Sequence, residues 1–226
     1  MSHPSARPLV ACSLLFGLFL VGCTESNDPP PAPTLVAVFE GVLGGEDGAE
    51  SGTFEISFMS DNSGSGTFTP TGGVAQALNN VLVNGSSFTA SGGGVSLSGT
   101  FTADDLSGSY TKASGDGLVA ALKRVTGATY TKYCASHNGD QGAGVYNFVW
   151  NPATHKLHGL WTTVGGAFQG IISGEDEVGS GAGATMAGNT GTVTILPDVG
   201  PPATLGGFYQ LASSTINGGM SGTSCP

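Results

Sequence analysis

Short stretches of alternating apolar and polar residues recur along the chain from residue 35 onward, separated by turns rich in Gly, Asn, Asp and Ser. Four examples are residues 53–58, 96–102, 144–150 and 192–196. A period of two places the apolar side chains on one face of a strand, and turn residues every 8 to 12 residues or so are typical of hairpins. The pattern predicts an all-β, Gly-rich antiparallel meander, folded as a barrel or a sandwich.

Residues 74–83 and 116–125 depart from this alternation. The apolar residues of each segment fit a short helix, and Asp116 stands near the N-cap position of the second. The same residues also fit a strand buried on both faces. We therefore expect at most one or two short helices in an otherwise all-β fold.

The two halves of the chain resemble each other in the order of their strands and turns. The matching segments are residues 39–41, 51–58, 64–69 and 106–110 in the first half and residues 133–134, 144–150, 157–162 and 220–225 in the second. This order predicts a tandem duplication of two meander units, although short Gly-rich strands also resemble one another by chance. We expect the units at 35–114 and 127–226, joined by a connector at 115–126.

The first 23 residues have a different character. A weakly positive start containing Arg7 precedes an apolar run at 9–21, which is shorter than a membrane span of about 20 residues and fits a signal-peptide core. The run ends in Leu20, Val21, Gly22 and Cys23. This segment resembles the lipobox of bacterial lipoprotein precursors, in which two aliphatic or small residues and a Gly precede the Cys.

The resemblance implies that the Cys23 thiol receives diacylglycerol, that the chain is cleaved after Gly22, and that the new amino terminus is acylated with a chain such as palmitate. Two or more acyl chains anchor a protein stably. Thr24 stands where Asp would retain the protein at the inner membrane, which implies the outer membrane in a Gram-negative cell. An ordinary secretory signal with an incidental Cys23 is the alternative, and both interpretations export the protein.

Residues 1–22 are thus expected to be the signal peptide and residues 23–34, with four prolines, a Pro-rich tether. After Cys23 the chain carries 16 acidic residues and five of its six basic ones, a formal charge of −11. Such a charge repels nucleic acid and anionic lipid head groups. We expect no nucleic-acid partner and contact with the membrane through the lipid alone.

Cys134 and Cys225 are the cysteines that follow Cys23. An even pair in an exported protein normally forms a disulfide, and this one would join the first and last strands of the second unit. A reactive or metal-binding thiol pair is the alternative, but the sequence has neither a CxxC motif nor a neighbouring His-rich ligand set.

Motifs for catalysis or cofactor binding are missing from the sequence, which contains no G-x-S-x-G, H-E-x-x-H or Walker-type G-K-[ST]. Residues 115–120 fit G-x-G-x-x-A, but their flanks are Gly-, Ser- and Thr-rich meander, so we interpret them as a turn. No cofactor is expected.

Two groups of residues are candidate metal ligands. One is three histidines around a predicted hairpin, His137, His155 and His158, and the other is a set of acidic turns at 46–50, 61–64 and 175–177. Zinc or copper needs three or four converging ligands, and the turns lack the spacing of known calcium loops. Exposed histidines and solvated turns are favoured, and no metal site is assigned.

Aromatic residues concentrate in the second unit. Tyr146, Phe148 and Trp150 alternate along one predicted strand and share a face, and Trp161 lies on the next strand. A core face is the ordinary explanation. Trp150 and Trp161 are nevertheless the candidate residues for binding a ligand, because aromatic surfaces hold sugars and peptides in many β-domains.

Two classes of function remain. The first is a non-catalytic, lipid-anchored envelope lipoprotein whose β-domain is structural or binds an envelope protein, a glycan or a small apolar ligand. The second is an envelope hydrolase with carboxylates assembled by the fold, such as Glu55 with Asp61 or Glu175 with Asp176. Carboxylates confined to exposed turns would favour the first class. Unpaired edge strands of a meander would also allow self-association.

Overall fold

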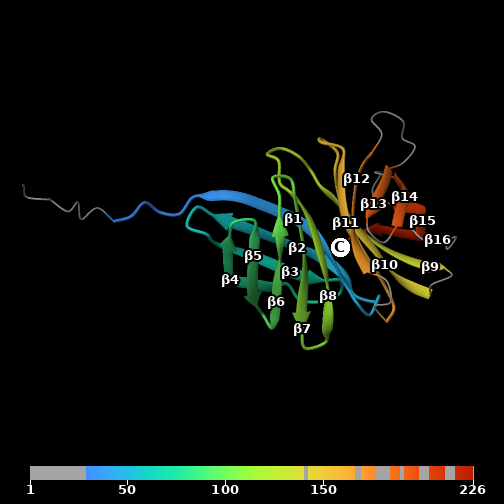
Figure 1. Ribbon diagram of the computed structural model, residues 1–226, viewed down its shortest axis with the longest axis horizontal. Helices are drawn as coiled ribbons and strands as arrows, with labels where there is room; N and C mark the ends of the chain where they lie inside the picture. Colours follow the sequence, from blue (N-terminus) through green and yellow to red (C-terminus); the bar gives the residue numbers. More distant parts are fainter. Residues whose placement is uncertain are drawn as a thin grey trace, which may run out of the picture. The chain divides into compact units, whose positions relative to one another are not determined.

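The structure is a computed structural model that describes residues 29–139, 142–165, 169–176, 184–188, 191–198, 204–211 and 217–225 (Figure 1). Within these residues the chain forms sixteen β-strands and no helix, which confirms the all-β antiparallel meander. None of the described residues belongs to a helix of the length and apolarity that a membrane span requires.

The first eight strands form one closed antiparallel barrel, drawn in blue to green in Figure 1. They are β1 (Leu35–Gly45), β2 (Ser51–Met59), β3 (Ser63–Pro70), β4 (Gln76–Asn84), β5 (Ser87–Gly92), β6 (Val95–Phe101), β7 (Asp105–Lys112) and β8 (Gly115–Lys123). Each strand pairs with the next, and β8 returns to β1 with Phe39 opposite Lys123 and Gly45 opposite Gly117.

The remaining strands form a second closed barrel with the same order, drawn in yellow to red. They are β9 (Thr131–Gly139), β10 (Gly142–Asn151), β11 (Lys156–Thr163), β12 (Gln169–Asp176), β13 (Ala184–Gly188), β14 (Gly191–Asp198), β15 (Thr204–Leu211) and β16 (Asn217–Ser224). Pairing of β16 with β9 closes this barrel.

Alternation fills the interior of the first barrel. On β2, Phe54, Ile56 and Phe58 are buried, while the residues between them lie on the other face. Burying one such side chain contributes about 1.5–3 kcal/mol relative to leaving it exposed. The core that results joins apolar side chains from all eight strands and is the main stabilising feature of this barrel.

Four strands are buried on both faces, namely β1, β8, β10 and β11 over most of their lengths. On β8, Val119 and Ala121 belong to the core of the first barrel. Ala120 between them packs instead with Val42 of β1 and Leu160 of β11. One face of each strand therefore fills its own barrel and the other face contacts the neighbouring barrel, so these strands lack the polar-out alternation of the rest.

This double burial explains the segment at 116–125, for which a short helix was one expectation. Residues 115–123 form β8, the strand that closes the first barrel, so the expected connector at 115–126 is corrected to the shorter segment 124–130. Residues 76–83 of the other ambiguous segment lie in β4, which is buried on one face only, with Leu82 65% exposed. Neither segment is helical.

The internal similarity holds for the first three strands of each barrel but fails at the end. Residues 106–110 lie in β7, the seventh strand of the first barrel, whereas residues 217–224 form β16, the eighth strand of the second. The Ser-Gly steps that suggested matching final strands thus occupy different positions.

Closure also removes the basis for self-association through unpaired edges. Both sheets close on themselves, so every described strand has a neighbour on each side. The expectation of edge strands assumed an open meander and is wrong for the described barrels.

Candidate binding cleft between the two barrels

The barrels contact each other through a small apolar cluster and a set of buried polar side chains. Val42, Ala120 and Leu160 form the centre of the cluster, and Leu118, Ile171 and Cys225 pack around it. A Cβ atom added to Gly44 would lie 2.4 Å from Cδ1 of Leu160 and 3.1 Å from Cγ2 of Val145. Glycine at this position therefore allows β1 to approach the second barrel closely.

Asn147 of β10 is the main polar link across this contact. Its side chain is fully buried, and its Nδ2 donates to the Leu43 carbonyl at 2.6 Å and to Ser51 Oγ at 3.0 Å. Its Oδ1 accepts from the backbone N–H of Ala135 at 3.2 Å. The Asn147 side chain thus joins β1 and the start of β2 to β9 of the other barrel. It forms the centre of a buried network in which its hydrogen-bond donors and acceptor all have partners.

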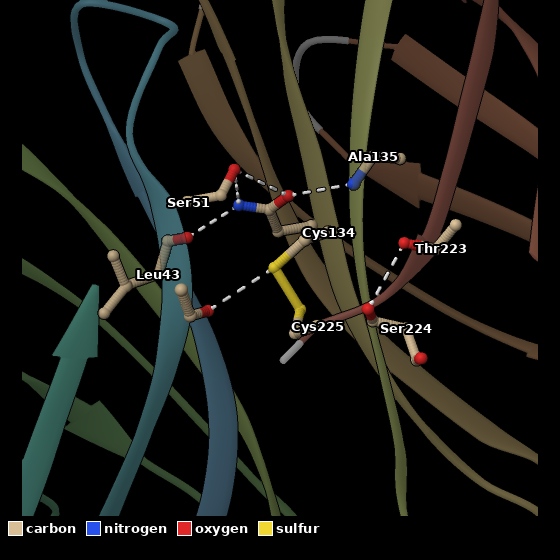
Figure 2. The surroundings of a disulfide bond; sticks show 9 residues. Leu43, Ser51, Cys134, Ala135, Thr223, Ser224 and Cys225 are labelled. Carbon is tan, nitrogen blue, oxygen red and sulfur yellow. Dashed lines mark hydrogen bonds between the residues drawn. A yellow bond between two sulfur atoms is a disulfide. The ribbon is translucent and has the colours of Figure 1, made fainter. Parts of the chain in front are cut away.

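Next to this network lies the predicted disulfide, which the structure confirms. Cys134 on β9 is bonded to Cys225, directly after β16, with the two Cα atoms 4.9 Å apart. Figure 2 shows the bond between the strands of the second barrel and facing Leu43 and Ser51 of the first. Sγ of Cys134 lies 3.9 Å from the carbonyl oxygen of Gly52. The disulfide therefore closes the second barrel at its contact with the first.

His158 of β11 is a second buried link. Its Nε2 lies 3.1 Å from the Leu106 carbonyl and 2.8 Å from Ser107 Oγ, and its Nδ1 lies 2.6 Å from Ser173 Oγ. A carbonyl can only accept, so the neutral ring donates from Nε2 and accepts at Nδ1. Burial lowers the pKa of His158, although the nearby Asp105 carboxylate acts in the opposite direction.

A cleft of about 1090 Å³ opens beside these contacts. Its walls include the loop between β1 and β2, the turn between β7 and β8, the middle of β9, the start of β10 and the end of β16. Four carboxylates line it, those of Glu46, Asp47, Glu50 and Asp116, together with one cation, Lys112. The cleft is therefore shared between the two barrels and its charged groups come from the first.

The charges of the cleft are partly compensated. Lys112 forms an ion pair with Glu50, and the Tyr110 hydroxyl donates to the same carboxylate. Burial raises the pKa of Tyr110, and the hydrogen bond to Glu50 raises it further. Gln169 of β12 donates to Glu46 at 3.2 Å. Beside the Lys112–Glu50 ion pair, the cleft therefore carries three further carboxylates, those of Glu46, Asp47 and Asp116. These negative charges favour the binding of positively charged groups or N–H donors.

The acidic loop has a fixed shape. Oδ1 of Asp47 accepts from the backbone N–H groups of Ala49 and Glu50 at 2.9 and 3.2 Å. Gly48 has a φ of 67°, and a Cβ there would lie 2.5 Å from the backbone nitrogen of Val164 in the second barrel. The loop packs directly against the second barrel, which orders its carboxylates at the rim.

The tryptophans proposed as binding residues do not line this cleft. Trp161 is fully buried and stacks on Tyr146 with ring centroids 5.0 Å apart. The register places Trp161 opposite Tyr146 and Trp150 opposite Leu157, so the two tryptophans do not form a cross-strand pair. The core explanation holds for Tyr146, Phe148 and Trp161, and Trp150 is half-buried.

The histidines do not converge. His137 is buried beside Tyr146 and lines the cleft, His158 lies in its own hydrogen-bond network, and His155 occupies a turn with a φ of 59°. Burial also lowers the pKa of His137. Among the described residues no group of three His, Cys, Asp or Glu side chains is placed to hold a metal ion.

The carboxylates suggested for hydrolysis occupy exposed positions. Glu55 pairs with Arg124 on the barrel surface, and a hydrogen bond from Ser63 lowers the pKa of Asp61, whereas a general acid needs a raised one. Glu175 is exposed, and the side chain of Asp176 lies outside the described residues, as do Cys23 and the lipobox. Glu55 and Asp61 are therefore both exposed and do not form the buried carboxylate pair suggested for hydrolysis.

Asn147 and His158 were not singled out as linking residues by the sequence. A signal for Asn147 exists, because it is a single amide between the apolar residues Val145 and Val149 of the same face. Its partner Leu43 is 104 residues away, so the link itself is not visible in a local pattern.

Comparisons with known proteins identify no family. No protein-family model matches the chain, and no curated protein matches it. Among solved structures, a mutant of transferrin binding protein B from Haemophilus parasuis aligns at 9% identity with a TM-score of 0.31, covering 85% of this chain and 76% of that one. Isotype 1 of transferrin binding protein B from Neisseria meningitidis aligns at 11% identity with a TM-score of 0.28, covering 89% of this chain and 61% of that one. Similarity at this level supports no inference about function.

Proposed function

We propose that the protein is a non-catalytic, lipid-anchored lipoprotein of the bacterial envelope that binds a partner in the cleft between its barrels. The lipobox at residues 20–23 supports the anchor, and the Pro-rich tether at 23–34 separates it from the first barrel. Outer-membrane placement follows from Thr24 in a Gram-negative cell. The acidic cleft is the observation that carries the binding role.

The partner that suits this cleft carries basic side chains. Glu46, Asp47 and Asp116 present negative charge at the rim, while a neutral glycan or an apolar ligand would leave these groups without compensation. An envelope protein with an exposed basic segment therefore fits better than the other partners expected from the sequence. Electrostatic attraction of this kind also predicts binding that weakens as salt is added.

The binding role of the cleft is tested by titrating the protein with hexalysine at low salt and measuring the binding by calorimetry. Asp116→Asn should weaken binding about threefold, because it removes one exposed carboxylate from the rim. Asp61→Asn is the matched control, since Asp61 lies at the opposite end of β2 from the acidic loop and carries the same charge. Equal loss in the two variants would show attraction by net charge alone and would contradict a binding role for the cleft.

The anchor is tested by fractionating cells that express the chain or its Cys23→Ser variant. The unsubstituted chain should be recovered with membranes and released by detergent. The variant should carry no acyl chains and should not be recovered with membranes. Membrane recovery that is the same for both chains would contradict lipidation at Cys23.

A further inference from the structure

The first barrel has an apolar pocket of about 550 Å³ at the end where β1 begins. Three aromatic rings form much of its wall, with Phe58 and Phe101 4.9 Å apart and Phe39 5.5 Å from Phe58. Met59 and Val83 are among its other apolar lining residues. Phe39 and Phe58 are only 1% and 3% exposed, so they form a floor beneath the mouth of the barrel.

Lys123 is the cation of this pocket. Its position on β8 is directly opposite Phe39 on β1, and directly paired residues lie on the same face of a sheet. Val119 and Ala121 occupy the preceding positions of that face and belong to the core. Lys123 therefore extends the interior face of the barrel to its mouth, where an apolar residue would continue the pattern.

The other basic residues after Cys23 all have partners. Ion pairs join Lys112 to Glu50, Arg124 to Glu40 and Glu55, Lys132 to Glu40, and Lys156 to Asp104. Lys123 forms no ion pair within the part of the chain that the structure describes. The pKa of Asp104 is lowered mainly by its hydrogen bond to Lys156 and only secondarily by the charge of Lys123.

We propose that the mouth of the first barrel binds a fatty acid, with its alkyl chain against Phe39, Phe58 and Phe101 and its carboxylate paired with Lys123. The pocket has a volume in the range of small-molecule sites, and the mouths of eight-stranded barrels commonly serve as such sites. An anionic membrane surface is a poor alternative occupant, because the formal charge of −11 after Cys23 opposes it. The site goes beyond the partner cleft and depends on neither the cleft nor the anchor.

The test uses the chain from residue 23 with Cys23→Ser, which retains the whole compact unit that begins at Pro33. Octanoate, decanoate and laurate are titrated below their micelle concentrations and followed by calorimetry. Affinity should rise about fourfold with each added methylene, as expected when each methylene leaves water. Dodecyltrimethylammonium has a linear alkyl chain one carbon longer but a positive head group, and it should still bind much more weakly than laurate.

Two substitutions locate the site. Lys123→Met keeps an apolar stem and should weaken laurate binding about fivefold. Lys132→Met, which removes one cation and leaves Arg124 on Glu40, should have no effect. Ala103→Trp changes an exposed residue at the pocket and should block the mouth while leaving the thermal midpoint unchanged.

Several results would overturn the proposal. These are a lack of saturable laurate binding, equal binding of laurate and dodecyltrimethylammonium, and laurate binding that persists unchanged in Ala103→Trp. Adsorption to phosphatidylglycerol vesicles without binding of monomeric laurate would also overturn it, because it would indicate a membrane-facing surface instead.

Discussion

Single buried polar side chains connect the two barrels, and each is placed by strand alternation. Asn147 lies between Tyr146 and Phe148, which face the interior of the second barrel, so its own side chain faces the first. An amide in an apolar contact is stable only when its donors and acceptor are used, and here all of them have partners across or beside the contact. Individual residues therefore define how β1 and β10 meet.

Replacing Asn147 with Ala should lower the free energy of unfolding by about 2–3 kcal/mol, because buried hydrogen bonds are lost and a cavity is left. Urea denaturation followed by tryptophan fluorescence measures this difference. Asn138→Ala is the matched control, since Asn138 is exposed on the neighbouring strand β9 and should change stability by less than about 0.5 kcal/mol. Equal effects of the two substitutions would show that the Asn147 network does not stabilise the contact.

The burial of His158 should make the stability of the protein depend on pH. Burial lowers its folded-state pKa below the ordinary value of 6.5, so below pH 6.5 the unfolded chain binds a proton that the folded chain does not. Stability should therefore be constant with respect to this group above pH 6.5 and fall as the pH decreases below it, by up to about 1.4 kcal/mol per pH unit.

The variant His158→Gln should remove this contribution. Urea denaturation at pH 7.5, 6.5 and 5.5 should give a smaller loss of stability on acidification than in the unsubstituted chain. A residual slope is expected, because burial also lowers the pKa of His137. Unchanged slopes in the variant would contradict a neutral, buried His158.

Whole strands, by contrast, follow from the sequence more directly than these side chains do. Residues 53–58 alternate clearly and lie in β2, and the disulfide follows from the even pair of cysteines. The segment at 116–125 was ambiguous because β8 is buried on both faces, and a continuous apolar run has no period that separates strand from helix. Local pattern identifies strands that face water, whereas strands between two barrels require knowledge of the partner barrel.

The approach of β1 to the second barrel predicts that Gly44→Val destabilises the protein. The added Cβ would overlap Leu160, and overpacking of this kind costs about 1–3 kcal/mol. Gly219→Val on β16 is the matched control, because a Cβ there meets no atom within 4 Å. Thermal unfolding should show a lower midpoint for Gly44→Val alone, and a midpoint equal to that of the control would contradict a close contact at Gly44.

On the scale of the whole molecule, two closed meander barrels share a contact and a cleft, the second barrel contains a disulfide, and residues 20–23 before them resemble a lipobox. The compact unit begins at Pro33, ten residues after Cys23. The fold class follows from periodicity, and the proposed anchor rests on a motif. The cleft does not follow from either, because its walls come from separate segments between residues 45 and 223.

The most direct test of the proposed anchored lipoprotein is the intact mass of the protein extracted from bacterial membranes, measured after alkylation with and without reductant. We predict a chain that starts at Cys23 and carries a diacylglycerol and an acyl group. Cys134 and Cys225 should be alkylated only after reduction. A chain without lipid, recovered in the soluble fraction, would contradict the anchor. Alkylation of Cys134 and Cys225 without reductant would contradict the disulfide between them.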